Sequence, residues 1–274
     1  MVEGGAQPSW RSFLWDGRLT FDGRTAHARS YNPHTATEFM NKDNRMIKFF
    51  YNLAPNPMKV ALLLEEVGLP YEPVPVDTRK GEQHLSSFTA INPNAKLPAL
   101  VDGDATLFDS NAIVLYLAEK TGKLLPADTP AARGEMLSWL MFIASGVGPY
   151  SGQCVHFRHV APEPKEYALN RYDFEAWRHW RILDERLAKR SYMLGDDYTV
   201  VDIALWGWAR MVPYVLGDAQ AWDKLPNVKR WFDAVNQRSA VQRVEELRKR
   251  HTWKAELDDE ARAALYPQNA RLPA

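Results

Sequence analysis

The chain has 274 residues, of which 46% are hydrophobic and 25% charged, so it is long enough for one large or two modest globular domains with a substantial core. Its 34 basic residues balance its 34 acidic ones, which argues against a dedicated nucleic-acid binder or a polybasic membrane-surface protein. A single cysteine, Cys154, excludes an intramolecular disulfide, a CxxC redox pair and a cysteine-based zinc site, so thiol redox chemistry would need a thiol from another molecule.

Residues 1–45 show neither helical nor strand periodicity, and we interpret them as an N-terminal arm. A small apolar cluster in the arm, at Trp10, Phe13, Leu14 and Trp15, is expected to pack onto a later domain. The arm lacks the uninterrupted apolar region of a secretory signal peptide, and no stretch approaches the roughly 18 apolar residues of a membrane-spanning helix. These features predict a cytoplasmic protein with no membrane partner.

Residues 46–124 open with a strand, helix, strand pattern. The run at 46–51 is apolar and aromatic, as in a buried strand, and 71–76 is extended with alternating valines. Between them, residues 58–67 have a helical composition, with a proline just before and Gly68 just after. Because a helix joins the two strands, we expect them to run parallel in one sheet.

The pattern then changes to a hairpin and a helix. Residues 77–95 are interpreted as a polar loop. Two short extended segments, 97–101 and 106–108, flank an Asp-Gly-Asp turn signal that is typical of a β-hairpin. The pair Asp109-Ser110 caps the apolar helix that follows. The predicted order is therefore β-α-β followed by β-β-α.

The remainder of the chain is interpreted as helical. Residues 165–189 carry apolar side chains at spacings of three and four, which marks one face of a long amphipathic helix. Thr199 and Asp202 form a capping-box signal before another apolar run. We divide the chain into an N-terminal arm (1–45), an α/β domain (46–124), a linker (125–132), a helical domain (133–250) and a C-terminal tail (251–274).

This arrangement resembles the glutathione S-transferase superfamily. Three strings carry the resemblance: Asn94 to Leu100 (NAKLPAL), Asp109 to Leu117 (DSNAIVLYL) and Tyr198 to Asp202 (YTVVD). The strings at 80–83, 148–153 and 168–172, with the Trp15-Asp16 pair of the arm, look most like the Nu class. The resemblance implies an α/β plus all-α fold, in which a thioredoxin-like β-α-β-β-β-α domain precedes an all-helical domain. It also implies a homodimer that uses glutathione as a co-substrate.

The resemblance assigns glutathione-binding roles to Asn56, Gln83, Lys96, Leu97, Pro98, Asp109, Ser110 and Arg171. Leu97-Pro98 matches the cis-proline position, where the Leu97 backbone would pair with the cysteinyl backbone of glutathione. Asp109 would pair with the amine, and Ser110 at a helix N-terminus would bind the γ-glutamyl carboxylate. Gln83 would contact the glycyl end or a neighbouring part, and Arg171 would reach a second glutathione across the dimer.

Taken by themselves, the same residues also fit ordinary structural roles. A trans proline can begin a strand, and Asp109-Ser110 can be a simple helix cap. Gln83 and Arg171 can be solvated side chains, which is the commoner place for both residue types.

Glutathione chemistry needs the thiolate, and free cysteine has a pKa of about 8.5, so the site must lower that value. At the matching position the Nu class, which this chain resembles, has a Thr-Pro-Asn element. This chain has Ala54-Pro55-Asn56 there and lacks the threonine hydroxyl. Asn56 is therefore the candidate catalytic residue, acting with the N-terminal dipole of the helix that begins near Pro57. Tyr51 is an alternative hydroxyl, and Asn56 alone also fits a turn residue between two prolines.

Three aromatic residues, Tyr150, Phe157 and Trp208, are candidates to line the pocket of the second substrate, with core packing as the alternative for Trp208. His156 and His159 have no nearby carboxylate to complete a set of metal ligands, so we expect no metal site. Cys154 is expected to be a buried, inert thiol, and a mixed disulfide with glutathione is the alternative.

Two functional hypotheses follow. In the first, the protein is a homodimeric enzyme that uses a bound glutathione thiolate on a disulfide or hydrophobic co-substrate. Its reaction would be disulfide-bond reduction, organic hydroperoxide reduction, conjugation or thiolytic cleavage of an electrophile. In the second, the chain is a non-catalytic dimerisation or regulatory module of the same fold, an alternative favoured by the missing threonine at position 54 and by the long arm.

Overall fold

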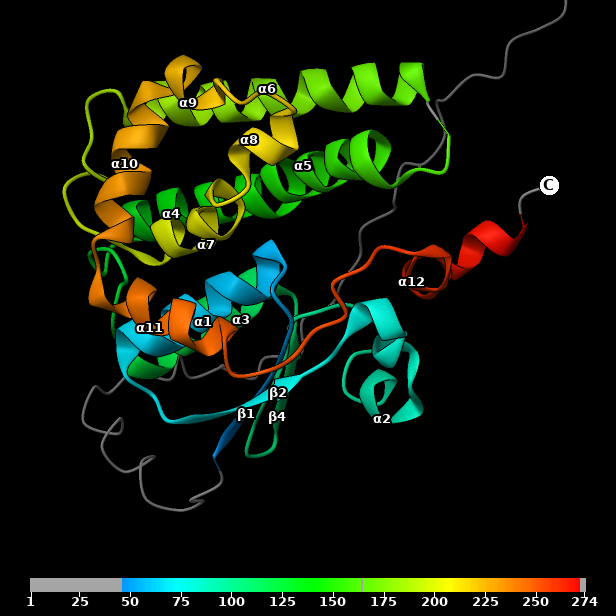
Figure 1. The fold of residues 1–274 in the computed structure, drawn as a ribbon. Coiled ribbons are helices and arrows are strands. Elements are labelled where there is room, and N and C mark those ends of the chain that lie inside the picture. The colour runs from blue at the N-terminus through cyan, green and yellow to red at the C-terminus, as the bar shows by residue number, and fades with distance from the viewer. Residues whose placement is uncertain (1–45, 164, 272–274) are drawn as a thin grey trace, which may run out of the picture. The chain divides into compact units, whose positions relative to one another are not determined.

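The computed structural model describes residues 46–163 and 165–271, so the predicted arm and its apolar cluster lie outside the described residues. Figure 1 shows a sheet flanked by helices, followed along the chain by a helical half. In chain order the strands and helices are β1 (Ile47–Tyr51), α1 (Pro55–Val67), β2 (Tyr71–Pro75), α2 (Ser86–Thr89), β3 (Ala99–Asp102), β4 (Ala105–Phe108), α3 (Ser110–Thr121), α4 (Pro130–Phe142), α5 (Gly148–Val155), α6 (Glu166–Leu187), α7 (Val200–Ala209), α8 (Val212–Leu216), α9 (Ala221–Lys224), α10 (Pro226–Asn236), α11 (Ser239–Arg248) and α12 (Asp259–Leu265).

The sheet has four strands in the order β2-β1-β3-β4. β1 runs parallel to β2 and antiparallel to β3, with Phe49 opposite Pro73 on one side and Leu100 on the other. β3 and β4 form the predicted antiparallel hairpin. The predicted parallel pair, hairpin and fold class are therefore confirmed.

Alternation along β1 explains how the sheet is covered. Ile47, Phe49 and Tyr51 point to one face and are buried in the main core with α1. Phe50 points to the other face, where its ring packs edge-on against Phe88 of α2 at 6.0 Å between ring centroids. The second face is covered only in part, because Lys48 is exposed and Phe50 is partly buried.

The prediction that residues 77–95 are a plain loop is wrong. This segment contains two 3₁₀ turns, Thr78–Lys80 and Glu82–His84, followed by α2. Asp77 caps the first turn by accepting from the backbone N–H of Arg79 at 3.1 Å. The elements are only three or four residues long, so no helical period could develop in the sequence.

α1 is the central element, because it packs against β1 and α3 in the sheet half and against α7 and α11 in the helical half. The close approach of α7 depends on Gly207, where an added Cβ would lie 2.3 Å from the carbonyl oxygen of Pro55. Tight packing across this contact fixes the start of α1 relative to α7. The two halves of the chain pack closely at this contact. The sequence boundary between the two proposed domains stays a prediction.

The capping box before α7 is confirmed. The backbone N–H of Thr199 donates to Asp202 Oδ2 at 2.9 Å, and the Thr199 hydroxyl caps the first turn of the helix. Asp202 also accepts from the indole N–H of Trp231 at 2.9 Å. Its complete burial raises the pKa of its carboxyl to about 6, although these hydrogen bonds favour the charged form.

The helices that line the site on the side of the helical half are irregular. Two π-helical segments, Ile143–Val147 and His156–Val160, flank α5 at its two ends. Such segments occur often at functional sites, because they change which side chains face one side of a helix. None of the helices in the described part of the chain is long and apolar enough to cross a membrane.

Candidate active site

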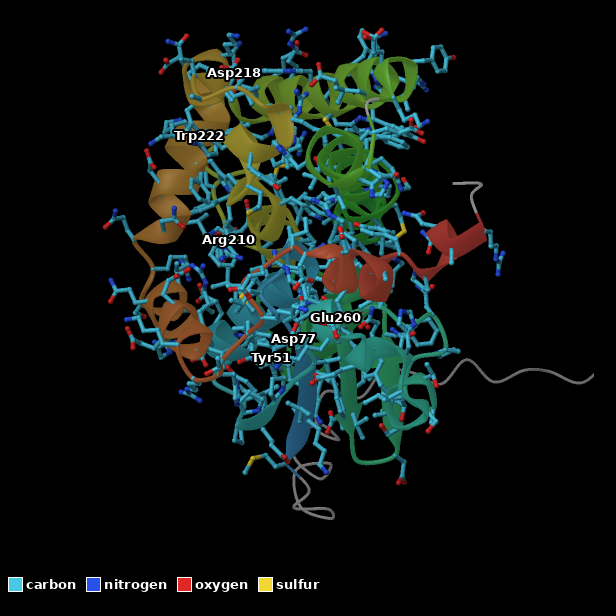
Figure 2. All side chains as sticks on the ribbon, turned by 45° about the vertical axis from the view of Figure 1, so that its right-hand side comes forward. Tyr51, Asp77, Arg210, Asp218, Trp222 and Glu260 are labelled. Atoms are coloured by element: carbon cyan, nitrogen blue, oxygen red, sulfur yellow. The ribbon has the colours of Figure 1, made fainter. Side chains whose placement is uncertain are left out.

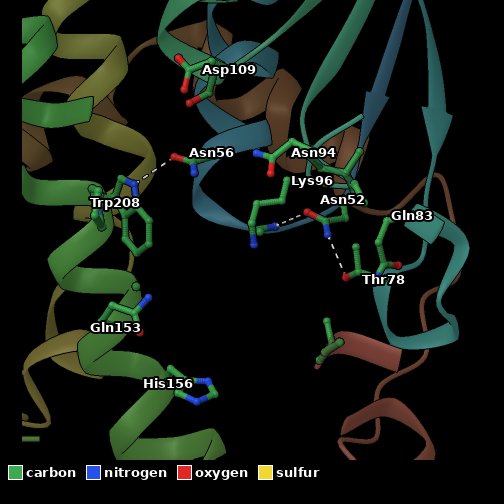
Figure 3. Close-up of a pocket in the computed structure, with 18 of the residues that line it drawn as sticks. Asn52, Asn56, Thr78, Gln83, Asn94, Lys96, Asp109, Gln153, His156 and Trp208 are labelled. Carbon is green, nitrogen blue, oxygen red and sulfur yellow. Dashed lines mark hydrogen bonds between the residues drawn. The ribbon is translucent and has the colours of Figure 1, made fainter. Parts of the chain in front are cut away.

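A cavity of about 770 Å³ lies where the start of α1 meets the segment before Pro98, the start of α3 and the side of α5. Figure 3 shows its side chains: Asn56 and Asp109 at one end, Gln153 of α5 and His156 of the following π-helical segment on one side, and Gln83 with Thr78 on the other. A volume of this size falls within the range of small-molecule binding sites.

The structure brings most of the predicted residues together. Asn56, Gln83, Lys96, Leu97, Asp109, Ser110 and Trp208 line the cavity. Pro98 is buried directly behind them, and the peptide bond between Leu97 and Pro98 is cis, as expected. The cavity is thus formed by segments from both halves of the chain.

The side chain of Asn56 is held by Trp208. The indole N–H of Trp208 donates to Asn56 Oδ1 at 3.0 Å, drawn as a dashed line in Figure 3. An indole nitrogen only donates, so this bond identifies the oxygen of the asparagine amide and leaves its NH₂ group as the remaining donor. Gly148 of α5 leaves room for the indole, since a Cβ there would lie 3.1 Å from Trp208 Nε1.

The start of α1 offers few other donors. Pro55 and Pro57 have no N–H group, and the N–H of Met58 donates to the carbonyl of Ala54 at 3.3 Å. Ala54 itself provides no side-chain cap. Asn56 is therefore the residue of this turn best equipped to donate a hydrogen bond into the cavity.

The start of α3 is shaped for an anion. Asp109 caps the helix through one carboxylate oxygen, Oδ1, which accepts from the backbone N–H groups of Asn111 and Ala112 at 2.9 and 3.1 Å. Its other oxygen, Oδ2, has no hydrogen bond within the described ranges. Ser110 is buried beside it at the first helical position, where the helix dipole favours negative charge.

Lys59 is a site residue that the sequence analysis missed. Its side chain lines the cavity and is 1% exposed, and its Nζ donates to Asn111 Oδ1 at 3.1 Å. Burial lowers the pKa of Lys59 to about 7, although the nearby charge of Asp109 opposes this shift. The spacing of three from Asn56 on one helix was the available signal, because it places both residues on the same face.

Gln83 is buried beside the C-terminal part of the chain. Its Nε2 donates to the carbonyl of Ala264 at 3.0 Å, whereas its Oε1 has no partner in the part of the chain that the structure describes. Leu265 and Tyr266 also line the cavity. No sequence pattern connected the tail with the site.

Four residues considered earlier lie outside the cavity lining. Arg171 on α6 pairs with Glu175, with 2.6 Å between Nη1 and Oε1. The rings of Tyr150 and Phe157 lie near Tyr172, at 6.2 and 5.4 Å between centroids. The hydroxyl of Tyr51 lies 2.7 Å from Nδ1 of His251, and burial raises its pKa to about 12, so it does not serve this site.

Cys154 is buried and lies outside the cavity lining. Its Sγ donates to the carbonyl of Val215 at 3.2 Å, and burial raises the pKa of the thiol. The geometry favours the inert interpretation. No group of His, Cys, Asp and Glu within residues 46–163 and 165–271 is arranged to hold a metal ion.

Comparisons with known proteins agree with this geometry. The family model of the glutathione S-transferase N-terminal domain matches residues 46–119, and that of the C-terminal domain matches residues 153–239. Over 203 residues the chain is 38% identical to the disulfide-bond oxidoreductase YfcG of Escherichia coli (strain K12), covering 72% of this chain and 93% of YfcG.

Two solved structures have the same fold. A Burkholderia graminis glutathione transferase, with two glutathione molecules bound per subunit, superimposes with a TM-score of 0.70 at 35% identity over 79% of this chain and 94% of its own. A Pseudomonas putida glutathione transferase, with one glutathione disulfide bound per subunit, gives a TM-score of 0.69 at 33% identity over 76% and 95%.

Proposed function

Because the chain belongs to the glutathione S-transferase family, we propose that it binds glutathione in the cavity at the start of α1 and uses the glutathione thiolate to reduce disulfide bonds. The observation that carries this proposal is the Trp208–Asn56 hydrogen bond, which leaves the Asn56 NH₂ group as a donor at the cavity. The similarity to YfcG, named as a disulfide-bond oxidoreductase, supports the choice of reaction.

The tripeptide would lie along the cavity with its γ-glutamyl end at the start of α3 and its glycyl end near Lys96 and Gln83. Its cysteinyl backbone would pair with the backbone of Leu97, and its γ-glutamyl carboxylate would bind Ser110 and the N-terminus of α3. The free Oδ2 of Asp109 is suited to the ammonium group, because the other oxygen is occupied by the helix cap. Lys96 and Gln83 would then contact the glycyl end.

Asn56 is the proposed catalytic residue. Its NH₂ group would donate to the sulfur of glutathione and would stabilise the thiolate more than the thiol, because a hydrogen bond to the charged form favours that form. The N-terminal dipole of α1 adds to the effect. The missing hydroxyl at Ala54 is thus replaced by an amide donor two residues later.

The reaction balances with two glutathione molecules. The first thiolate attacks one sulfur of the substrate disulfide, forming a mixed disulfide and releasing the other sulfur as a thiolate. A second glutathione thiolate attacks the glutathione sulfur of the mixed disulfide, giving glutathione disulfide and a second substrate thiolate. The two released thiolates take up the protons lost by the two glutathione molecules. The two relatives crystallised with two glutathiones or with glutathione disulfide support this stoichiometry.

Two further features belong to the proposal. A homodimer is part of the proposal, and in it Arg171 would reach a second glutathione, although Arg171 pairs with Glu175 in the single chain. A cytoplasmic location is also part of the proposal, and the single cysteine, Cys154, means that the fold relies on no intramolecular disulfide. Sedimentation analysis tests the dimer, with a monomer at micromolar concentration as the contrary result.

Calorimetry with glutathione and with glutathione disulfide tests the proposed function, followed by turnover of 2-hydroxyethyl disulfide. We expect binding of both ligands and measurable reduction. Ser110→Ala should weaken glutathione binding about tenfold, because it removes a hydrogen bond to a charged group worth roughly 1.5 kcal/mol. Ser138→Ala, at an exposed serine on α4, is the control and should bind as the wild type does. If the wild type binds neither ligand, the non-catalytic module favoured by Ala54 replaces this proposal.

A further inference from the structure

The C-terminal segment 251–271, which we call the strap, crosses the cavity region after the last helix of the helical half. The family model of the C-terminal domain ends at residue 239, so the strap lies outside both matched family domains.

The strap is first attached to the sheet half of the structure. The backbone N–H of Lys254 donates to Asp77 Oδ2 at 2.8 Å, and Arg79 Nη1 donates to the carbonyl of Lys254 at 3.2 Å. The ring of Trp253 packs edge-on against Tyr51, at 5.4 Å between centroids. Figure 2 labels Tyr51, Asp77 and Glu260 in this region, where the strap passes over the segment that follows β2.

The strap is then attached to the helical half. Arg262 Nη1 donates to the carbonyl of Val160 at 2.7 Å, at the end of the π-helical segment that follows α5. The ring of Tyr266 packs against His156, with 4.6 Å between centroids and 64° between planes. The strap thus joins the sheet half to the helical half, where the Arg262 side chain bonds the Val160 carbonyl and the Tyr266 ring packs against His156.

Both members of that aromatic pair line the cavity, at the end away from Asp109, where His156 lies in Figure 3. Partial burial lowers the pKa of His156 and raises that of Tyr266, so burial favours the uncharged form of each ring. This part of the cavity therefore has a wall of two aromatic rings, whereas the Asp109 end carries charged groups.

The strap also orients a side chain on the proposed glutathione side. The carbonyl of Ala264 accepts from Gln83 Nε2, and the Gln83 amide must therefore present its oxygen away from the strap. That oxygen is buried and has no partner among the described residues, so a ligand N–H group would satisfy it. The strap thus contacts both Gln83, in the proposed glutathione site, and His156, at the other end of the cavity.

We propose that Tyr266 is a specificity-determining residue: with His156 it narrows the cavity at the end away from Asp109 and Asn56, where a disulfide would enter to reach the bound thiolate, so that the protein reduces low-molecular-weight disulfides in preference to disulfides on folded proteins. This inference rests on the proposed glutathione chemistry. Removal of the Tyr266 ring would widen the approach, whereas the glutathione contacts at Leu97, Ser110 and Asp109 would remain.

Paired kinetics test the proposal, with 2-hydroxyethyl disulfide as the small substrate and a glutathionylated folded protein as the large one. Tyr266→Ala should raise the ratio of kcat/KM for the large substrate over the small one about tenfold, equivalent to roughly 1.4 kcal/mol in relative barrier height. Arg262→Ala, which detaches the strap from Val160 without removing the ring, should raise the ratio in the same direction.

Two matched variants serve as controls. Tyr266→Phe keeps the ring and should keep the wild-type ratio, and Tyr167→Ala removes an 86% exposed tyrosine on α6 that does not line the cavity. Calorimetry should give glutathione affinities within about twofold of wild type for all four variants. An unchanged ratio in Tyr266→Ala, with glutathione binding intact, would overturn the role of Tyr266 alone. A wild type that binds no glutathione would instead overturn the proposed function, and this inference with it.

Discussion

Trp208 donates its indole hydrogen to Oδ1 of Asn56, joining α7 to the first turn of α1 across 152 positions of sequence. The bond selects one of the two orientations of the asparagine amide. In that orientation the NH₂ group remains free to donate. Trp208 is therefore a positioning residue for the proposed thiolate site, in addition to lining the cavity.

Trp208→Phe should impair the reaction through Asn56 without removing the aromatic packing. The variant loses the indole donor, so the amide of Asn56 can turn over and present its oxygen to the sulfur. We expect kcat/KM to fall about fivefold at pH 7, because one positioned hydrogen bond contributes about 1 kcal/mol. The pH profile of kcat/KM should also move to higher pH, and a purely structural role for Trp208 would not move it. Trp222→Phe, at a tryptophan that stacks on Phe232 away from the cavity, should retain wild-type kinetics.

Gly207→Ala should separate α7 from α1. The added methyl group would lie 2.3 Å from the carbonyl oxygen of Pro55, which is backbone and cannot turn away. We expect a loss of about 2 kcal/mol in the free energy of unfolding, together with weaker glutathione binding. Gly134→Ala is a matched control on α4, where nothing lies within 4 Å of the new Cβ, and it should stabilise the protein by about 0.5–1 kcal/mol. Urea unfolding of both variants measures the difference, and equal stabilities would contradict the close contact.

Lys59→Met should change the pH dependence of stability. The folded-state pKa of Lys59, about 7, lies well below the ordinary lysine value, because the buried ammonium is poorly solvated. Between pH 7 and 9 the unfolded chain keeps this proton while the folded protein loses it, so the wild type gains stability as pH rises. The variant lacks this gain, and its stability relative to wild type should fall by about 2 kcal/mol from pH 6 to pH 9.

Urea unfolding at the two pH values measures the change caused by Lys59→Met. Lys48→Met, at an exposed lysine of β1, is the control and should show the same pH dependence as wild type. A difference that stays constant from pH 6 to pH 9 would mean that Lys59 keeps its proton over this range. Glutathione binding should weaken in Lys59→Met as well, because the start of α3 loses a neighbouring positive charge.

Local sequence signals correctly predicted the strand and the helix starts that position the site. The strand at 46–51, the Asp109-Ser110 cap and the Thr199–Asp202 capping box each depend on residues within a few positions of one another. The short turns and α2 after Asp77 were missed, because three or four residues are too few for a periodic pattern.

The contacts that complete the site are tertiary, and no local pattern encodes them. Asn56 was placed correctly at a helix start, but its partner Trp208 comes from another helix. In the sequence, Lys59 looks like an ordinary lysine of a helix. Its ammonium group is buried because Asn111 of α3 accepts a hydrogen bond from it. The strap contains no long periodic segment, so its path over Asp77 and past His156 could not be derived from the sequence.

The central claim is that Asn56 stabilises the thiolate of bound glutathione. It is tested most directly by titrating the thiolate absorbance near 240 nm in the protein–glutathione complex, for the wild type and Asn56→Ala. The account predicts a bound-thiol pKa below the value of about 8.5 for a free thiol in the wild type, and a rise of about one pH unit in Asn56→Ala. Equal pKa values in the two complexes, with glutathione bound in both, would contradict it.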